Sequence, residues 1–209
     1  MCGMGIVMIA LIDYGMGNLG SVQKALAKVG CEPQITPDPK VVAQADGVVL
    51  PGVGAFDDCI RNLRDRGLDV AVKEAIAAGK PFLGICLGLQ MLFDSSEEGG
   101  KEPGLGIIPG KVVRFKHALK IPQIGWNQIN LKAQAPHLRG VPEAAWVYFV
   151  HSYYVVPDDP SLAATTTDYG YEFVSAIWKD NVFASQFHPE KSQAVGLTML
   201  SNFAKVVGG

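Results

Sequence analysis

A cysteine stands between two glycines where an apolar segment gives way to a helical pattern. Residues 82–85 are apolar, and residues 84–88 read Gly-Ile-Cys-Leu-Gly. This is the nucleophile-elbow pattern with cysteine in place of serine, in which the glycines allow a sharp strand-to-helix turn. At a helix N-terminus the macrodipole favours a thiolate. The pattern predicts that Cys86 is a nucleophile, although cysteine is also a common core residue.

A histidine and a glutamate two positions apart supply the base that such a nucleophile needs. Residues 186–190 read Gln-Phe-His-Pro-Glu and end an apolar segment. In extended backbone, residues i and i+2 point to the same side, and the proline biases His188 away from the helical region. Glu190 is therefore expected to orient His188, while His188 serves Cys86. The contexts of His117, His137 and His151 are weaker.

A glycine-rich turn, Pro-Gly-Val-Gly at residues 51–54, ends another apolar segment. Glycine tolerates backbone angles that other residues avoid. Backbone N–H groups of Val53 and Gly54, together with that of Leu87 after the cysteine, are predicted to form an oxyanion hole. Taken alone, this tetrapeptide predicts only a turn.

Two other patterns suggest different chemistry. Gly15, Gly17 and Gly20 form a G-x-G-x-x-G match between a strand and a helix, with Asp38 where a ribose-binding acid is sought. A charged and a bulky residue before the first glycine, and prolines around the second strand, disfavour a dinucleotide site. Cys2 would become an N-terminal nucleophile if the initiator methionine were removed. Enzymes with an N-terminal nucleophile have a layered antiparallel core. The alternating strand and helix pattern that follows Cys2 does not suit such a core.

The elements that must position these residues alternate in the first half of the chain. Apolar segments typical of buried strands occupy residues 5–13, 31–36, 47–50 and 82–85. Helical spacing occupies residues 18–29, 56–78 (broken near Gly67) and 87–94. This alternation predicts a parallel sheet with right-handed crossovers.

The second half of the chain has a different pattern. A polar, glycine-rich loop at residues 95–106 is followed by β-like segments at residues 111–116, 126–131, 146–156, 173–179 and 182–187. A closing amphipathic helix spans residues 192–207. We expect these strands to extend the sheet or to pack beside it.

Composition narrows the class of protein. The 209 residues are 48% hydrophobic and 18% charged, with a net charge of −2, so we expect a globular chain that binds neither nucleic acid nor an anionic membrane. The apolar runs fall short of the roughly 20 residues that span a bilayer. Four cysteines without CxxC spacing predict no disulfide or zinc framework. We expect a cytoplasmic protein with one domain over residues 1–209 and a disordered extension at residues 1–5.

Together, residues 84–88, 188–190 and 51–54 resemble the class I, triad-type glutamine amidotransferases. Further segments resemble the members of this family that supply ammonia for histidine biosynthesis, namely residues 13–19, 124–127, 148–154 and 188–192. The resemblance implies a flavodoxin-like α/β fold, with an open, mostly parallel sheet, helices on both faces and an added antiparallel β layer. It also accounts for the G-x-G-x-x-G match without a nucleotide.

The resemblance also implies roles for individual residues and a partner. Cys86 would attack the side chain of glutamine, and the ammonia would pass to a (β/α)8-barrel cyclase on a separate chain, which together with this chain forms a heterodimer. No metal or organic cofactor is implied for this chain. The implied substrate contacts are Gly54, Gln90, Ser152 and Tyr153, and the implied partner contacts are Asn18, Trp126 and Lys191.

Three alternatives stay open at this point. The chain is also compatible with the glutaminase subunit of another synthase, in a purine or pyridoxal pathway. A regulatory subunit with an inactive triad is disfavoured because Cys86, His188 and Glu190 are all present. A dinucleotide-binding domain would be supported by absorbance of a co-purified cofactor.

Overall fold

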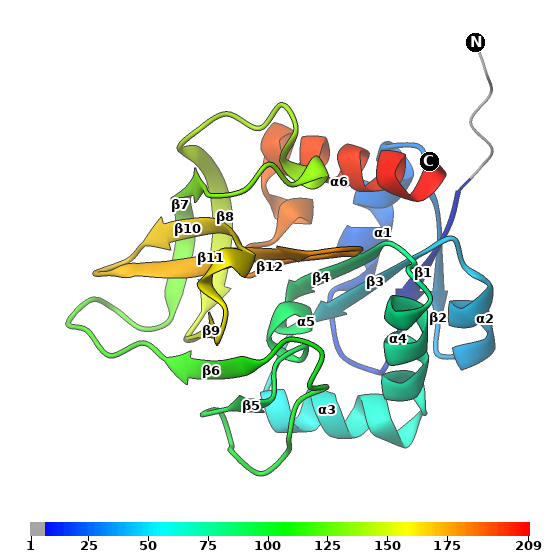
Figure 1. Ribbon diagram of the computed structural model, residues 1–209, viewed down its shortest axis with the longest axis horizontal. Coiled ribbons are helices and arrows are strands. Elements are labelled where there is room, and N and C mark those ends of the chain that lie inside the picture. The colour runs from blue at the N-terminus through cyan, green and yellow to red at the C-terminus, as the bar shows by residue number, and fades with distance from the viewer. Residues whose placement is uncertain (1–6) are drawn as a thin grey trace.

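A computed structural model describes residues 7–209, so Cys2 and the predicted extension at residues 1–5 lie outside the described part of the chain. Its central feature is a parallel sheet in the order β2-β1-β3-β4-β12 (Figure 1). The strands are β1 (Met8–Ile12), β2 (Glu32–Thr36), β3 (Gly47–Gly52), β4 (Phe82–Cys86) and β12 (Val182–Ser185). This is the flavodoxin-like strand order, and it confirms the predicted fold class.

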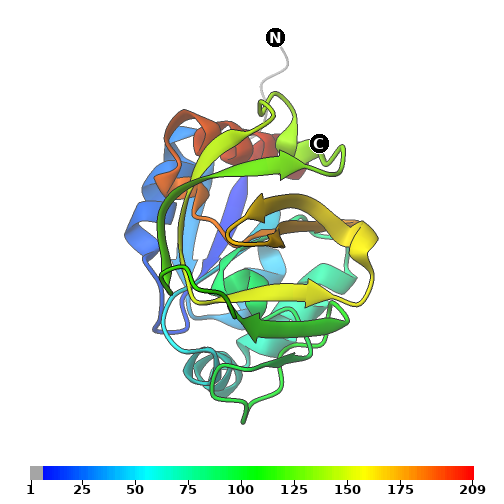
Figure 2. The same ribbon diagram turned by 90° about the vertical axis from the view of Figure 1, so that its left-hand side faces the viewer.

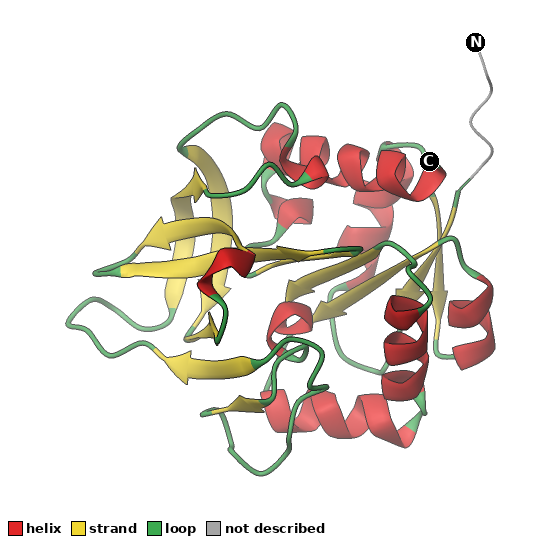
Figure 3. Ribbon diagram, viewed as in Figure 1, coloured by secondary structure: helices red, strands yellow, loops and turns green. Residues whose placement is uncertain are grey.

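Helices cover both faces of the sheet (Figure 3). The sheet is apolar on both faces, so each face packs into its own buried hydrophobic cluster. In β1, Ile9 and Leu11 belong to the first cluster, and Ala10 and Ile12 belong to the second. The first cluster includes residues of α1 (Leu19–Lys28) and α6 (Gln193–Gly208). The second includes residues of α2 (Pro39–Gln44), α3 (Phe56–Asp65) and α4 (Leu68–Ala77). None of the helices within residues 7–209 is long and apolar enough to cross a membrane.

An antiparallel layer continues the sheet beyond the carboxyl ends of the parallel strands, at the left of Figure 1. Its strands are β6 (Gly110–Arg114), β7 (Gln123–Leu131), β8 (Ala145–His151), β9 (Tyr153–Pro157), β10 (Ala163–Asp168) and β11 (Glu172–Lys179). Strand β11 joins it to the parallel sheet by pairing with β12. In Figure 2, which looks onto this layer, β7 and β8 run along its left side to the top, β10 and β11 lie in the middle, and β6 and β9 lie below. The remaining elements are β5 (Ser95–Ser96), η1 (Pro136–Leu138), η2 (Pro160–Leu162) and η3 (Pro189–Lys191).

Several predicted boundaries were wrong for reasons that lie in the tertiary structure. The helix predicted over residues 87–94 is only α5 (Leu87–Gln90), because N–H groups of the segment at residues 104–107 bond the carbonyl groups of residues 91–94. The single strand predicted over residues 146–156 divides at Ser152 into β8 and β9, which pair with different strands. Helix α2 and strand β10 were not predicted. The break near Gly67 is confirmed, with φ +66° at that residue.

Acid is expected to destabilise the protein through His137. This residue is 2% exposed, and its ring stacks on Phe183 with centroids 4.5 Å apart. Burial lowers the pKa of His137 from 6.5 to about 4. The unfolded chain therefore binds more protons than the folded chain between these values, so stability falls as the pH falls through this window.

We expect His137→Phe to reduce the loss of unfolding free energy between pH 7 and pH 5 by about 2 kcal/mol. Urea unfolding of both proteins at the two pH values measures this difference. Burial also lowers the pKa of His151 to about 4. This residue is the same in the variant and the parent, so its contribution to the pH dependence is common to the two proteins. An equal loss in variant and parent would contradict the prediction.

Candidate active site

Cys86 lies at the last position of β4, where the strand passes directly into α5. Its backbone has φ +56° and ψ −108°, a combination that residues with a side chain rarely adopt. A Cβ atom on Gly88 would lie 1.9 Å from the carbonyl oxygen of Leu50, and one on Gly84 would lie 2.9 Å from Cβ of Ala184. Glycine is therefore required on both sides, and the predicted strand-to-helix turn is confirmed.

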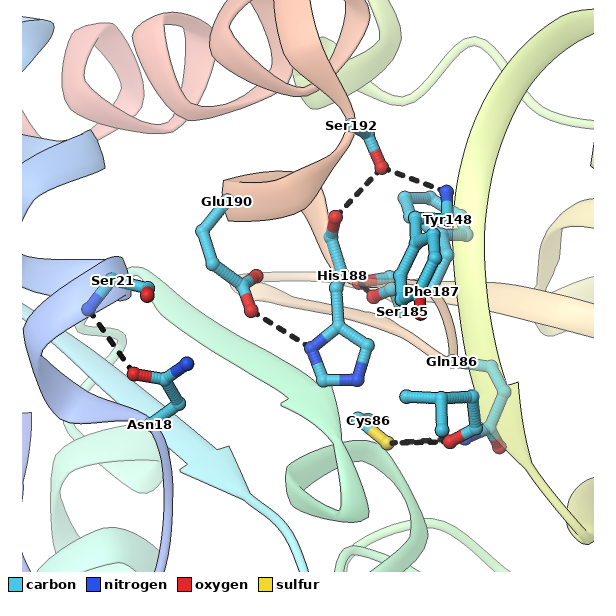
Figure 4. A network of polar contacts seen from close by, with 11 residues as sticks. Asn18, Ser21, Cys86, Tyr148, Ser185, Gln186, Phe187, His188, Glu190 and Ser192 are labelled. Atoms are coloured by element: carbon cyan, nitrogen blue, oxygen red, sulfur yellow. Dashed lines mark hydrogen bonds and ion pairs between the residues drawn. The ribbon is translucent and has the colours of Figure 1, made fainter. Parts of the chain in front are cut away.

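His188 and Glu190 follow β12 and form a buried pair. Nδ1 of His188 lies 2.8 Å from Oε1 of Glu190, and the two side chains are 3% and 1% exposed. The backbone of His188 is fixed on both sides. Its N–H donates to the carbonyl of Tyr148 at 2.9 Å, and its carbonyl accepts from Oγ of Ser192 at 2.7 Å. Ser192 in turn accepts from the N–H of Tyr148 at 3.0 Å (Figure 4).

The other ring nitrogen of His188 is available to act on Cys86. Figure 4 shows the sulfur of Cys86 below the ring, with Glu190 on the other side. Nε2 is buried and has no hydrogen-bond partner within residues 7–209. Burial lowers the pKa of His188, but the interactions with Cys86 and Glu190 outweigh it and raise this pKa from 6.5 to about 10. The arrangement therefore favours a protonated imidazole beside the sulfur of Cys86.

One cavity of about 320 Å³ contains Cys86 and His188. Every residue predicted for the oxyanion hole or for substrate binding lines this cavity, namely Val53, Gly54, Leu87, Gln90, Ser152 and Tyr153. They come from the turn after β3, from helix α5 and from the junction of β8 and β9. This is the edge of an open α/β sheet at which ligands bind, outside the carboxyl ends of the strands.

Of the three residues predicted to contact a partner, Asn18 lies beside the His188–Glu190 pair, and Trp126 and Lys191 lie against Tyr148, whose carbonyl accepts from the N–H of His188. Asn18 caps α1 by accepting from the N–H of Ser21 at 3.4 Å, and it lines a small pocket shared with His188 and Glu190. Trp126 on β7 is 43% exposed, and its ring meets that of Tyr148 edge-on at 6.1 Å. Nζ of Lys191 lies 5.8 Å from the centre of the same tyrosine ring.

The glycine turn after β1 does not suit a dinucleotide. A Cβ atom on Gly15 would lie 3.1 Å from the guanidinium of Arg66, so an arginine side chain occupies the space beside the turn. That guanidinium donates to the carbonyl of Tyr14. Asp38 accepts from the N–H of Lys40 at 2.8 Å and caps α2. It is therefore engaged as a helix cap. Within residues 7–209, no group of three or more His, Cys, Asp or Glu side chains is placed to hold a metal ion.

Sequence reasoning missed several residues of the site. His151 and Glu98 line the cavity, and Gln186 donates from Nε2 to Sγ of Cys86 at 3.7 Å. His151 contacts the carbonyl of Tyr153 at 2.8 Å, and nothing local in the sequence signals that contact. Gln186 did carry a signal, because it stands two positions before His188 and extended backbone puts i and i+2 on one side.

The comparisons with known proteins agree with this geometry. The sequence model of the class-I glutamine amidotransferase family matches residues 10–207. The chain belongs to the class-I glutamine amidotransferase family.

Within that family, the chain is 57% identical over 203 residues to the imidazole glycerol phosphate synthase subunit HisH of Syntrophotalea carbinolica, covering 94% of this chain and 98% of the relative. It is 55% identical over 205 residues to the HisH subunit of Geobacter sulfurreducens, covering 95% and 98%. It is therefore a member of the HisH subunits. A crystal structure of a putative GMP synthase subunit from Thermoplasma acidophilum has the same fold, with a TM-score of 0.73, 22% identity and coverage of 97% and 94% of the two chains.

Proposed function

We propose that this chain acts in the cytoplasm as one amidotransferase domain over residues 1–209. It hydrolyses glutamine to glutamate and ammonia through Cys86, His188 and Glu190. The ammonia passes to a cyclase subunit that makes imidazole glycerol phosphate and aminoimidazole carboxamide ribotide in histidine biosynthesis. The observation that carries the proposal is that a cysteine on a strained strand-to-helix turn shares one cavity with a histidine held by a buried glutamate.

The first half of the reaction forms a thioester. The thiolate of Cys86 attacks the side-chain carbonyl carbon of glutamine, and the carbonyl electron pair moves to oxygen. Backbone N–H groups of Leu87 and of the Val53–Gly54 turn stabilise this oxyanion. The imidazolium of His188 then gives its Nε2 proton to the leaving nitrogen, so that the C–N bond breaks and ammonia departs. The raised pKa of His188 supports this step, because the ring carries its proton at neutral pH.

The second half restores the enzyme. Neutral His188 takes a proton from water, whose oxygen attacks the thioester carbon. The C–S bond breaks, Cys86 leaves as a thiolate beside the reprotonated imidazole, and glutamate is released. Glu190 accepts a hydrogen bond from the Nδ1–H of His188 through both halves and so fixes the tautomer of the ring.

The proposed partner is a (β/α)8-barrel cyclase that forms a heterodimer with this chain. Support comes from exposed apolar side chains on the outer face of β7 and β8, since Ile124, Trp126 and Trp146 are 61%, 43% and 54% exposed. Contiguous exposed apolar surface is typical of protein interfaces. This surface continues to Tyr148 and Lys191, next to the His188–Glu190 pair. Gly54, Gln90, Ser152 and Tyr153 are proposed to hold glutamine.

We expect the glutaminase turnover number to rise roughly 10²–10³-fold when the cyclase and its nucleotide ligand are both present. The physical reason is the turn at residues 51–54. Val53 is 39% exposed and has glycines on both sides, one of them at φ +107°. The peptide before Val53 can therefore rotate and supply an oxyanion donor when the partner docks.

The measurement is turnover of the chain alone, with the cyclase, and with the cyclase plus its ligand. Trp126→Ala is the interface control, because it should weaken the activation and leave the turnover of the isolated chain unchanged. Equal rates in all three conditions would contradict the switch. Glutamine-dependent product only with a purine or pyridoxal pathway synthase would contradict the choice of partner.

A further inference from the structure

We infer that Gln186 is a further catalytic residue, whose amide N–H contacts the sulfur of Cys86 and whose carbonyl oxygen orients Gln90 toward glutamine. The inference rests on the proposed function, since it assigns Gln186 to the same thiolate and the same substrate.

The placement of Gln186 is fixed by the sheet. The residue follows β12, is fully buried, and donates its backbone N–H to the carbonyl of Ser175 at 2.8 Å. Its side chain lies beside Cys86 in Figure 4. Nε2 donates to Sγ of Cys86 at 3.7 Å, and Oε1 accepts from Nε2 of Gln90 at 3.0 Å. One amide therefore touches both the nucleophile and a residue of the substrate cavity.

The orientation of both amides follows from a backbone carbonyl. The carbonyl of Tyr153 accepts only, so the group of Gln90 that contacts it at 3.1 Å must be Nε2. Nε2 of Gln90 also donates to Gln186, so Oε1 of Gln186 must face it, and Nε2 of Gln186 is left to face the sulfur. The order of donors and acceptors thus runs from Tyr153 through Gln90 and Gln186 to Cys86.

The contact with sulfur favours the charged form of the nucleophile. A neutral thiol has a partner in the carbonyl of Val150, which lies 4.0 Å from Sγ and accepts only. A thiolate cannot donate to that carbonyl, and a hydrogen bond that the charged form accepts stabilises it. The amide N–H of Gln186 supplies such a bond. Removing it should therefore shift the balance toward the thiol.

The contact with Gln90 prepares the cavity for substrate. Both protons of the Gln90 amide are used, on Gln186 and on Tyr153. Oε1 of Gln90 is buried and has no partner among the described residues. A buried acceptor without a partner is costly until a donor reaches it, and the N–H groups of glutamine are such donors. Without the contact to Gln186, the Gln90 amide can rotate, and its Oε1 then no longer faces the substrate.

Two variants separate the roles. Gln186→Met removes both contacts and adds no charge, so it decides the role at sulfur. Gln186→Glu keeps an acceptor for Gln90 but replaces the donor to sulfur by a carboxylate, whose charge also disfavours a thiolate, so it serves for the comparison of KM. The first readout is the rate at which iodoacetamide alkylates Cys86 as a function of pH, followed by mass spectrometry, and it needs no substrate. The second is kcat and KM for glutamine with the activating cyclase. Thr165→Val is a matched control, because it removes a buried polar contact to Ser175 on the same sheet.

In both Gln186 variants we expect the pH midpoint of alkylation to rise by on the order of one unit. The KM should rise about tenfold in Gln186→Met only, and the control should match the parent. The other titratable groups facing Cys86 are the same in every protein. They are His188 beside the sulfur, Glu98 and His151 in the cavity, and Tyr14 and Cys59, which interact with it electrostatically.

An unchanged midpoint in folded Gln186→Met, which adds no charge, would overturn the role at sulfur. An unchanged KM in Gln186→Met would overturn the role at Gln90. If the parent chain with its cyclase fails to hydrolyse glutamine, the proposed function fails, while the alkylation midpoints still decide whether Gln186 stabilises the thiolate.

Discussion

Cys86→Ala is expected to abolish glutamine hydrolysis, with turnover falling by more than about 10³-fold, because removing the nucleophile of a catalytic triad removes nearly all chemistry that the triad performs. Cys86 alone among the described cysteines combines a strained strand-to-helix turn with a His–Glu partner in a cavity. Turnover is measured with the activating cyclase bound, so that a low resting rate does not hide the effect.

The matched controls are the other cysteines. Cys31 and Cys59 are buried free thiols, and Cys31→Ala and Cys59→Ala should retain activity, as should Cys2→Ala. An electrophilic glutamine analogue should label Cys86 alone. Labelling at Cys2 would assign the chemistry to an N-terminal nucleophile instead of the triad, and full activity of Cys86→Ala would contradict the proposed mechanism.

Glu190→Gln is expected to lower turnover by roughly 10²–10⁴-fold without eliminating it, as loss of the orienting acid does in serine triads. The glutamine keeps the shape of the side chain but removes the negative charge that lies 2.8 Å from Nδ1 of His188. The fold should be retained, because Ser192 and Tyr148 still fix the backbone of His188.

The sign of the pH effect follows from the same pair. Cys86 and Glu190 raise the pKa of His188 to about 10 against the effect of burial. Removing the Glu190 charge lowers this pKa, so the imidazolium is lost at a lower pH and the alkaline limb of the pH–rate profile should move down. Glu102→Gln, which changes a carboxylate paired with Arg64 at 2.8 Å, is the control and should leave the profile unchanged. An unchanged turnover number in Glu190→Gln would show that Glu190 is not a catalytic partner.

Much of the site was predictable because its constraints are local. The turn at residues 84–88 depends on glycines that no side chain can replace, since an added Cβ at Gly88 would meet a backbone oxygen at 1.9 Å. The His–Glu pair depends on the two-residue period of extended backbone and on one proline. The buried parallel strands depend on continuous apolar runs. Each of these signals lies within a few residues of the feature that it predicts.

The missed elements depended on partners far away in the chain. Strand β10 is composed of alanine, threonine and aspartate and has no apolar alternation, so its pairing with β11 and β7 forms it. Helix α5 ends at Gln90 because the segment at residues 104–107 bonds the next carbonyl groups. Neither the formation of β10 nor the end of α5 can be predicted from the propensities of the neighbouring residues.

By itself, then, the sequence determined the nucleophile elbow, the His188–Glu190 pair, the glycine turn and the parallel core, because turn sterics and side-chain period act over a few residues. Only the tertiary structure decided that these features open into one cavity, and that the amides of Gln90 and Gln186 have a single orientation there. The reason is that a hydrogen bond needs its donor and acceptor at a defined distance and angle. Tyr153, Gln90, Gln186 and Cys86 meet across sequence separations of 63, 96 and 100 residues, and only the packed sheet brings them together.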